Sequence, residues 1–165
     1  SVLFMAFVGE EKGLLGSEWY SDHPAFPLED HVCDLNMDMV GRFDEAHADD
    51  DRYVYLIGGD KLSTDLHSIS EAVNEKHIGL SLDYTFNAPD DPNRFYYRSD
   101  HYNFAKNNVP IIFYFNGTHE DYHQIGDTPD KIEYDLLENR SRLIFYTAWE
   151  LANRDQRIKV DKTGK

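Results

Sequence analysis

The sequence has little cysteine, little positive charge and no long apolar run. Its single cysteine, Cys33, has no partner for an intrachain disulfide, which excludes a disulfide-stabilised scaffold. Lysine and arginine number 16 against 31 aspartates and glutamates, for a net charge of −15. Because phosphate binding needs a basic face, this balance excludes a nucleic-acid partner. No apolar stretch approaches the roughly 20 residues of a membrane span, so we expect none in this portion.

What is present fits a globular α/β domain. The chain has 165 residues, of which 41% are hydrophobic, and it shows no repeat or low-complexity block. Apolar strand patterns alternate with helical ones, which favours a three-layer α/β/α fold with a mostly parallel, or mixed, central sheet. We expect strands at 2–8, 32–39, 53–57, 80–86 and 111–115, and helices at 12–21, 63–76, 99–106 and 135–153. Ser63 is expected to cap the second of these helices, and Asp135 with Glu138 resembles a capping box at the start of the last one. The polar tail from 154 onward is expected to fray.

Two adjacent carboxylates, Glu10 and Glu11, follow the apolar run 2–8 and precede a helical pattern. Two neighbouring carboxylates at the end of a buried strand need a positive partner, and a metal ion is the leading candidate. The alternative is that both acids favour the positive N-terminus of the next helix. The rest of the chain decides between them.

Two further polar positions follow apolar strand patterns. Asp38 closes the segment 32–39, and an acid at an apolar strand end needs a cation. The stretch 117–129 follows the strand at 111–115 and carries His119 and His123. Carboxylates and an imidazole at one sheet edge suit zinc, with manganese or cobalt as alternatives.

Four ordered motifs carry a family resemblance. The sequence reads Phe7-Val8-Gly9-Glu10-Glu11-Lys12-Gly13-Leu14-Leu15-Gly16-Ser17, then Asn36-Met37-Asp38-Met39-Val40-Gly41, then Ser99-Asp100-His101 with Phe104, and last Asp121-Tyr122-His123 with Asp127-Thr128. The chain resembles the dinuclear zinc aminopeptidases of peptidase clan MH, the leucine-aminopeptidase-like zinc exopeptidases. The resemblance covers roughly residues 1–155.

The resemblance implies roles for five residues. Glu10 is the general base, Glu11 and His123 share one zinc, and Asp38 binds the other. Tyr122 resembles a tyrosine that donates to the oxyanion in some members. The other histidines of these motifs, His101 and His119, are interpreted as groups that support the site or lie on the surface.

The resemblance also implies an activity and a place in a longer chain. The expected activity is metal-dependent removal of N-terminal residues from peptides, in a protein exported to the periplasm or the medium. The family's remaining ligands, a histidine and a metal-bridging aspartate, precede the Glu-Glu motif, and here only Ser1–Gly9 does. We therefore interpret 1–155 as the C-terminal portion of one catalytic domain, with 156–165 as a polar tail. By itself this portion is expected to be inactive.

Three alternatives stay open. A glutaminyl-cyclase-like transferase shares the architecture but uses one zinc, and a carboxypeptidase or dipeptidase can share the same scaffold. The third is a receptor-like binding module without catalysis, which would have lost ligands that this chain retains. The sequence does not determine the oligomeric state.

Three smaller features also have two interpretations each. Ser99 or Asp100 can cap the helix that follows, or orient a metal ligand from behind. Arg98 can bind a substrate carboxylate or pair with one of the many acids. The acidic stretch Asp44–Asp51 is interpreted as a solvated loop rather than a calcium site, because it lacks the ligand spacing of a calcium loop.

Overall fold

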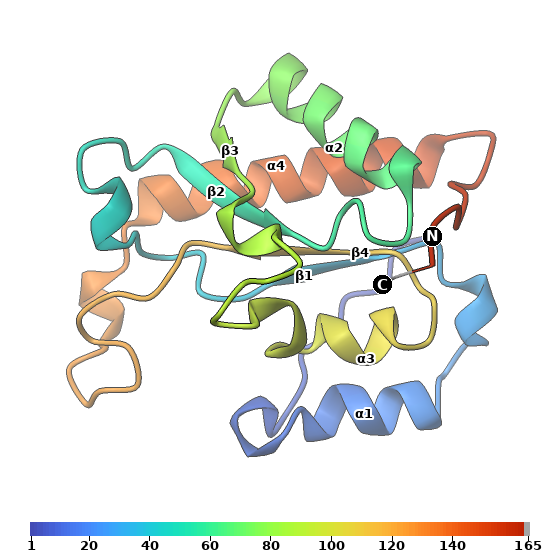
Figure 1. The fold of residues 1–165 in the computed structure, drawn as a ribbon, viewed down its shortest axis with the longest axis horizontal. Coiled ribbons are helices and arrows are strands. Elements are labelled where there is room, and N and C mark those ends of the chain that lie inside the picture. The colour runs from blue at the N-terminus through green and yellow to red at the C-terminus, as the bar shows by residue number, and fades with distance from the viewer. Residues whose placement is uncertain (164–165) are drawn as a thin grey trace.

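The computed structural model describes residues 1–163, which form one mixed sheet between two layers of helices (Figure 1). The strands are β1 (Asp34–Met37), β2 (Tyr53–Ile57), β3 (Ser81–Asp83) and β4 (Ile111–Phe115), in the spatial order β1-β4-β2-β3. The pairs β1/β4 and β2/β3 are parallel, whereas β2 and β4 are antiparallel. The α/β fold with a mixed sheet is therefore confirmed.

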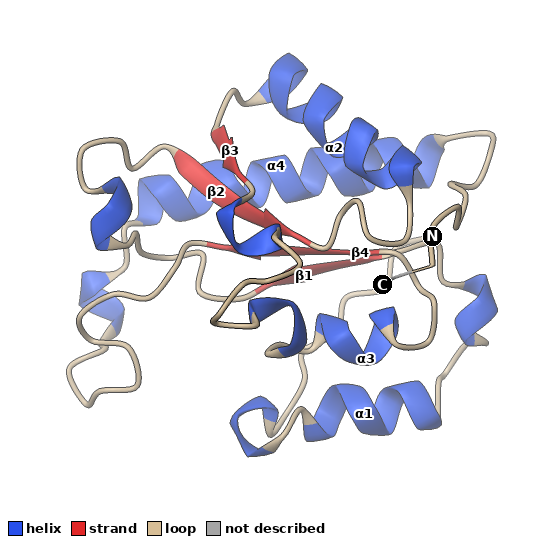
Figure 2. Ribbon diagram, in the orientation of Figure 1, coloured by secondary structure: helices blue, strands red, loops and turns tan. Residues whose placement is uncertain are grey.

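The helices form the outer layers (Figure 2). Helices α2 (Thr64–His77) and α4 (Tyr134–Asn153) cover one face of the sheet, and α1 (Leu15–Asp22) and α3 (His101–Ala105) cover the other. This arrangement is the expected α/β/α sandwich.

The two central strands match the predicted bounds because both of their faces are buried. Every residue of β2 and β4 is buried, so each strand reads as a continuous apolar run. Alternate side chains separate to the two faces: Leu56 and Tyr114 pack with α2 and α4, whereas Ile57 and Phe113 pack on the α3 side.

The predicted strand at 2–8 is wrong for the part of the chain that the structure describes. These residues pair with no strand among 1–163, and Phe4 is 90% exposed. Only alternate side chains turn inward; Phe7, for example, lies 6.0 Å from the ring of Phe104. An apolar run alone does not make a strand, because a strand also needs a hydrogen-bonding neighbour.

Two strands and the first helix differ from their expected bounds. The predicted strand 80–86 ends early, because a 3₁₀ turn replaces it at Thr85–Asn87, and β1 is shorter than 32–39. The predicted helix 12–21 is divided into a 3₁₀ turn at Glu10–Lys12 and α1. The Ser63 cap of α2 is confirmed by the hydroxyl, which accepts from the Leu66 amide at 3.2 Å.

The expected capping box of α4 is also wrong. The helix begins at Tyr134, and no side chain caps its first turn. Glu138 instead pairs with Arg142 one turn later, at 3.4 Å. The 3₁₀ turn at Pro129–Lys131 already sets the direction of the chain into this helix.

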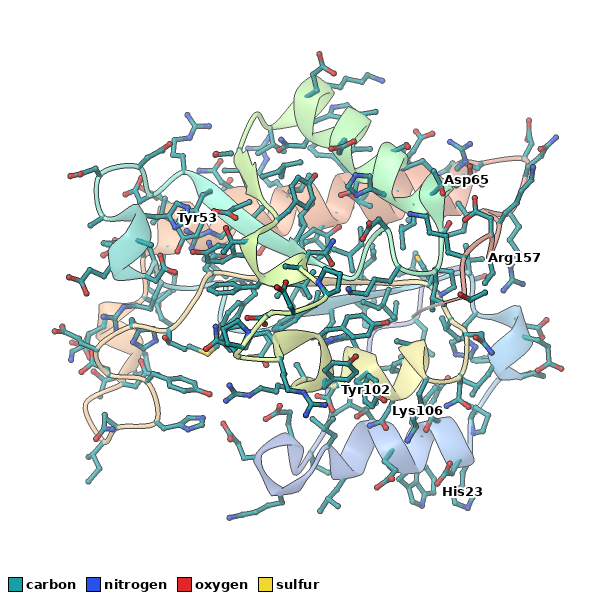
Figure 3. All side chains as sticks on the ribbon, in the orientation of Figure 1. His23, Tyr53, Asp65, Tyr102, Lys106 and Arg157 are labelled. Carbon is teal, nitrogen blue, oxygen red and sulfur yellow. The ribbon has the colours of Figure 1, made fainter. Side chains whose placement is uncertain are left out.

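The segment after α4 packs against the domain instead of fraying. Ile158 is only 5% exposed in the core beneath α2 and α4, and Asp65 accepts from the Lys159 amide at 3.1 Å. Asp65 and Arg157 lie at the same end of the molecule in Figure 3. The last two positions of the predicted tail, 164 and 165, fall outside the described residues. No helix within residues 1–163 is long and apolar enough to cross a membrane.

The topology brings distant segments to one edge of the sheet. Because β1 and β4 are parallel, Asp38 after β1 and the loop 116–128 after β4 emerge at the same edge. The start of β2 lies there too, since β2 runs antiparallel to β4. Ligand sites of open α/β sheets form at such edges.

Candidate active site

A cleft of about 690 Å³ opens at this edge of the sheet. Its walls include all five residues that the sequence predicts for catalysis or metal binding: Glu10, Glu11, Asp38, Tyr122 and His123. They come from three segments far apart in the sequence, so the fold rather than local sequence gathers them.

Glu10 and Glu11 lie in a tight 3₁₀ turn rather than at the end of a strand. The turn is flanked by Gly9 and Gly13, whose φ values of 70° and 105° favour glycine. The Gly13 and Leu14 amides both donate to the Glu10 carbonyl, at 3.0 and 2.8 Å. This closed turn fixes the backbone of the two acids above the cleft.

Asp38 immediately follows β1, and its carboxylate is held from behind. Ser99 Oγ donates to Asp38 Oδ2 at 2.8 Å, and Asn36 Nδ2 donates to the same hydroxyl at 3.0 Å. Burial raises the pKa of Asp38, and the Ser99 hydrogen bond opposes this shift. No side chain caps α3, so Ser99 orients Asp38, whereas the capping interpretation is wrong.

The loop after β4 places His123 against Glu11. The His123 Nε2 lies 3.0 Å from Glu11 Oε1, although 112 residues separate the two positions. The His123 backbone adopts a φ of 58°, and its ring stacks on Tyr122 with the ring centroids 3.8 Å apart. A positive φ at a non-glycine residue costs free energy, and such strain is found at functional sites.

The cleft concentrates negative charge. Burial, followed in order by the charges of Asp38, Glu11 and Asp100, raises the pKa of Glu10 to about 7. Only His123 acts in the opposite direction among the causes of this shift. A carboxylate with a pKa near 7 can both accept and release a proton at neutral pH.

Ion pairs anchor the loop that carries His123. Asp121 accepts from Lys131 Nζ at 2.6 Å and from Arg42 Nη1 at 3.2 Å. Arg42 also lies 3.7 Å from Asp127, at the other end of the loop. These contacts tie the loop to the segment after β1 and to the turn before α4. Sequence reasoning missed them, because single charges in an acidic chain give no signal of their partners.

The side chains of the cleft match the chemistry of a divalent metal. The predicted ligands, Glu11, Asp38 and His123, offer two carboxylates and one imidazole, which are hard or borderline donors that suit zinc. The acids of the cleft also repel one another, and a cation would offset this repulsion. Among residues 1–163, no three histidine, cysteine, aspartate or glutamate side chains are close enough to hold one ion by themselves. The described residues thus offer the Glu11–His123 pair for one ion and Asp38 for a second position.

The other two motif histidines lie in different surroundings. His101 is fully buried, donates from Nε2 to the Tyr96 carbonyl at 2.8 Å, and stacks on Phe113. Burial lowers the pKa of His101 to about 4, so the ring is neutral at pH 7. His119 lies in the wall of the cleft, 3.9 Å from Asp127. His101 supports the layer beneath the site, so the surface interpretation does not hold for it.

Asp44 is an exception to the interpretation of the acidic stretch as a solvated loop, whereas Glu45, Asp49 and Asp50 are exposed as expected. Its carboxylate is buried and accepts from the hydroxyls of Tyr53, at 3.1 Å, and Tyr55, at 2.8 Å. The His47 Nδ1 lies 3.0 Å from the same carboxylate. In Figure 3, Tyr53 and Arg157 lie at opposite ends of the sheet. The cleft opens at the end where Tyr53 lies.

Comparison with protein families gives a match over most of the chain. The family model described as "Peptidase family M28" matches residues 1–148. A search of curated proteins found no match.

Solved structures share the fold. The LapA aminopeptidase of Legionella pneumophila is 23% identical with a TM-score of 0.70, over 91% of this chain and 38% of that one. BSAP, a zinc aminopeptidase from Bacillus subtilis, is 24% identical with a TM-score of 0.67, over 96% and 36%. The aminopeptidase from Aneurinibacillus sp. strain AM-1 is 20% identical with a TM-score of 0.64, over 94% and 33%. The chain therefore spans well under half the length of these structures.

Proposed function

Because this chain belongs to peptidase family M28, we propose that it forms part of a zinc-dependent aminopeptidase that removes N-terminal residues from peptides. The observation that carries the proposal is the 3.0 Å contact between His123 and Glu11 in a cleft shared with Glu10 and Asp38. The similarity to LapA, an aminopeptidase, and to BSAP, a zinc aminopeptidase, supports the same activity.

The metal roles follow from the donor set. Glu11 and His123 would hold one zinc, and Asp38, oriented by Ser99, would hold a second. Bound zinc would polarise the scissile carbonyl and lower the pKa of the attacking water. Two ions need further ligands, which this portion of the domain does not supply among residues 1–163.

The remaining steps belong to side chains of this chain. Glu10 accepts the proton of the attacking water and passes it to the leaving amine, so one proton is conserved through the cycle. Its partly buried position in the cleft and its pKa near 7 support this role. The Tyr122 hydroxyl lines the cleft and can donate to the oxyanion that forms when water adds to the carbonyl.

The isolated 165-residue chain is proposed to bind zinc weakly and to be inactive. The chain spans 38% of LapA and 36% of BSAP, so an equivalent of much of those catalytic structures lies outside it. In a two-metal site, a bridging carboxylate fixes the separation of the metals. Residues 1–163 contain no group of three or more ligand side chains that could hold a metal ion, so they do not form such a site by themselves. Export of the whole protein is a further proposal that rests on the family resemblance.

The test uses the full-length protein that contains this chain, loaded with zinc. The substrates are leucyl-alanine amide, N-acetyl-leucyl-alanine with a free carboxyl end, and a glutaminyl peptide. The proposal predicts release of leucine from the free-amine peptide and no cleavage of the acetylated one. Cleavage of the acetylated peptide would favour a carboxypeptidase, pyroglutamyl product would favour a cyclase, and no reaction would favour a binding module.

A further inference from the structure

Arg98 is a cationic side chain of the cleft that forms no ion pair with residues 1–163. The other arginine in the cleft wall, Arg42, is neutralised by Asp121 and Asp127. Arg98 instead contacts the Tyr122 hydroxyl, with the two atoms 3.5 Å apart, and the ring of Phe95, 5.1 Å from its centroid. In a chain with 31 acids and 16 basic residues, an unpaired arginine at an acidic cleft calls for an explanation.

The position of Arg98 is fixed by its neighbours in the sequence. Phe95 and Tyr96 are buried in the 3₁₀ turn that precedes it, and Ser99, which follows, is buried against Asp38. The Arg98 amide also donates to the Phe95 carbonyl at 3.0 Å. The backbone of Arg98 is therefore held on the same support as Asp38, and the exposed guanidinium reaches the cleft from there.

The cleft wall consequently carries both a group of acids and a cation without an ion pair among residues 1–163. Glu10, Glu11 and Asp38 are the acids, and Arg98 is the cation. Tyr122 connects the two, because it stacks on His123, which contacts Glu11, while its hydroxyl lies beside Arg98. Arg98 is thus linked to the Glu11–His123 pair through one side chain, Tyr122, and a few residues of extended peptide, at about 3.3–3.6 Å per residue, cover such a separation.

We infer that Arg98 binds the C-terminal carboxylate of a short peptide, so that the preferred substrates are dipeptides and tripeptides with a free carboxyl end. This inference rests on the proposed function and names the substrate class of that site. The planar guanidinium can hold a carboxylate through two parallel hydrogen bonds. A short peptide with both ends free is neutral overall, whereas a net charge of −15 repels longer acidic peptides.

The experiment compares kcat/KM for three peptides with the full-length, zinc-loaded protein. Leucyl-alanine carries the terminal carboxylate, and leucyl-alanine amide lacks it. The third peptide, the α-amide of leucyl-aspartic acid, carries a carboxylate only on its side chain. We expect the first peptide to be preferred over the second by roughly 5- to 20-fold, mainly through KM, since the charged contact is partly exposed. In Arg98→Gln this ratio should fall to about one, and in Arg98→Lys it should stay in between.

The control is Arg94→Gln, which removes an equal charge four residues away. Arg94 stacks on Tyr97 and lies outside the cleft wall, so the preference should persist in this variant. A leucyl-alanine analogue with a reduced peptide bond cannot be hydrolysed, and its dissociation constant can be measured by calorimetry. In Arg98→Gln this constant should rise by the same factor as KM for leucyl-alanine.

Each outcome separates this inference from the proposed function. Equal cleavage of leucyl-alanine and its amide by the unmodified protein would overturn the role of Arg98 and leave the aminopeptidase proposal intact. Preference for the aspartyl amide alone would assign Arg98 to an acidic side chain and also overturn the inference. If none of the three peptides is cleaved, the proposed function fails and this inference fails with it.

Discussion

The hydroxyl of Ser99 donates a hydrogen bond of 2.8 Å to the carboxylate of Asp38, across 61 residues of sequence. Ser99 is 2% exposed, and the same hydroxyl accepts from Asn36, two positions before Asp38. The bond joins the segment before α3 to the end of β1. It fixes the orientation of the Asp38 carboxylate in the wall of the cleft. Groups that orient a metal ligand from behind affect metal affinity almost as strongly as the ligands do.

Ser99→Ala should therefore weaken zinc binding by roughly 10- to 100-fold in the full-length protein. The measurement is zinc affinity by competition with a chelator. Ser21→Ala removes another buried serine hydroxyl, one that bonds only within α1, and should leave affinity unchanged. Equal affinities for the Ser99 and Ser21 variants would show that Ser99 does not position Asp38.

Asp121→Ala should loosen the loop that carries His123. The Asp121 carboxylate contacts Lys131 and Arg42, and these pairs hold the loop at its centre. We expect backbone amides of 117–128 to exchange with deuterium roughly three- to tenfold faster, because ion pairs of limited burial contribute modestly. The neighbouring Glu120→Ala, at an exposed position, should leave exchange unchanged. Unchanged exchange in both variants would mean that other contacts hold the loop.

Asp34 on β1 should make stability depend on pH. Its side chain is buried, its Oδ2 has no hydrogen-bond partner among residues 1–163, and burial followed by the charge of Asp100 raises its pKa from 3.8 to about 7. The folded state therefore binds this proton more tightly than the unfolded state, and its contribution to stability decreases as the pH rises from about 4 to 7.

The variant Asp34→Asn keeps the neutral form at every pH. Relative to the unmodified protein, its free energy of unfolding should increase by about 2–4 kcal/mol between pH 4.5 and 7.5, measured by denaturant titration. Asp30→Asn, at an exposed acid, supplies the control and should show no such change. A pH-independent difference for Asp34→Asn would rule out a buried, neutral carboxyl.

Asp44 should contribute to folding rather than to catalysis. In Asp44→Ala the hydroxyls of Tyr53 and Tyr55 lose a buried acceptor, which should cost about 2–4 kcal/mol of unfolding free energy. Asp49→Ala, in the same acidic stretch but exposed, should cost almost nothing. The measurement is again denaturant titration; similar midpoints for the two variants would restore the solvated-loop interpretation.

Gly117→Ala tests the same cluster from the other side. Gly117 has a φ of 78°, and a Cβ there would collide with the Asp44 carboxylate. The substitution should destabilise the fold by roughly 1–3 kcal/mol through strain and displacement of Asp44. Gly13 also has a positive φ, but a Cβ there would have open space around it. Gly13→Ala therefore measures the cost of backbone strain without a collision. Equal losses would mean that the contact with Asp44 adds nothing.

The sequence predicted the parts of the fold whose signals are local. The bounds of β2 and β4 are correct, because buried strands read as apolar runs bounded by turn residues. The Ser63 cap is correct, because a cap depends on residues three positions apart. The run 2–8 misled the prediction, since its apolar pattern does not reveal whether a neighbouring strand is available.

Motif resemblance identified residues that the fold brings to one cleft, but it did not identify the residues that support them. Glu10, Glu11, Asp38, Tyr122 and His123 do line one cleft, as the motifs implied. The anchoring pairs of Asp121 and the burial of Asp44 depend on partners that only the folded chain brings together. Charge patterning predicts that such residues are solvated, because it cannot identify a distant tyrosine or arginine as the partner.

The central claim is that Glu11 and His123 hold a zinc ion while Glu10 acts as the base. The most direct measurement is zinc content by mass spectrometry together with leucine release, in the full-length protein carrying Glu10→Gln, His123→Ala or His119→Ala. We predict that Glu10→Gln retains zinc but loses roughly 10²- to 10⁴-fold in kcat. His123→Ala should lose zinc, whereas His119→Ala, from the same loop, should keep it. Full zinc content in His123→Ala, or equal zinc loss in all three variants, would contradict the account.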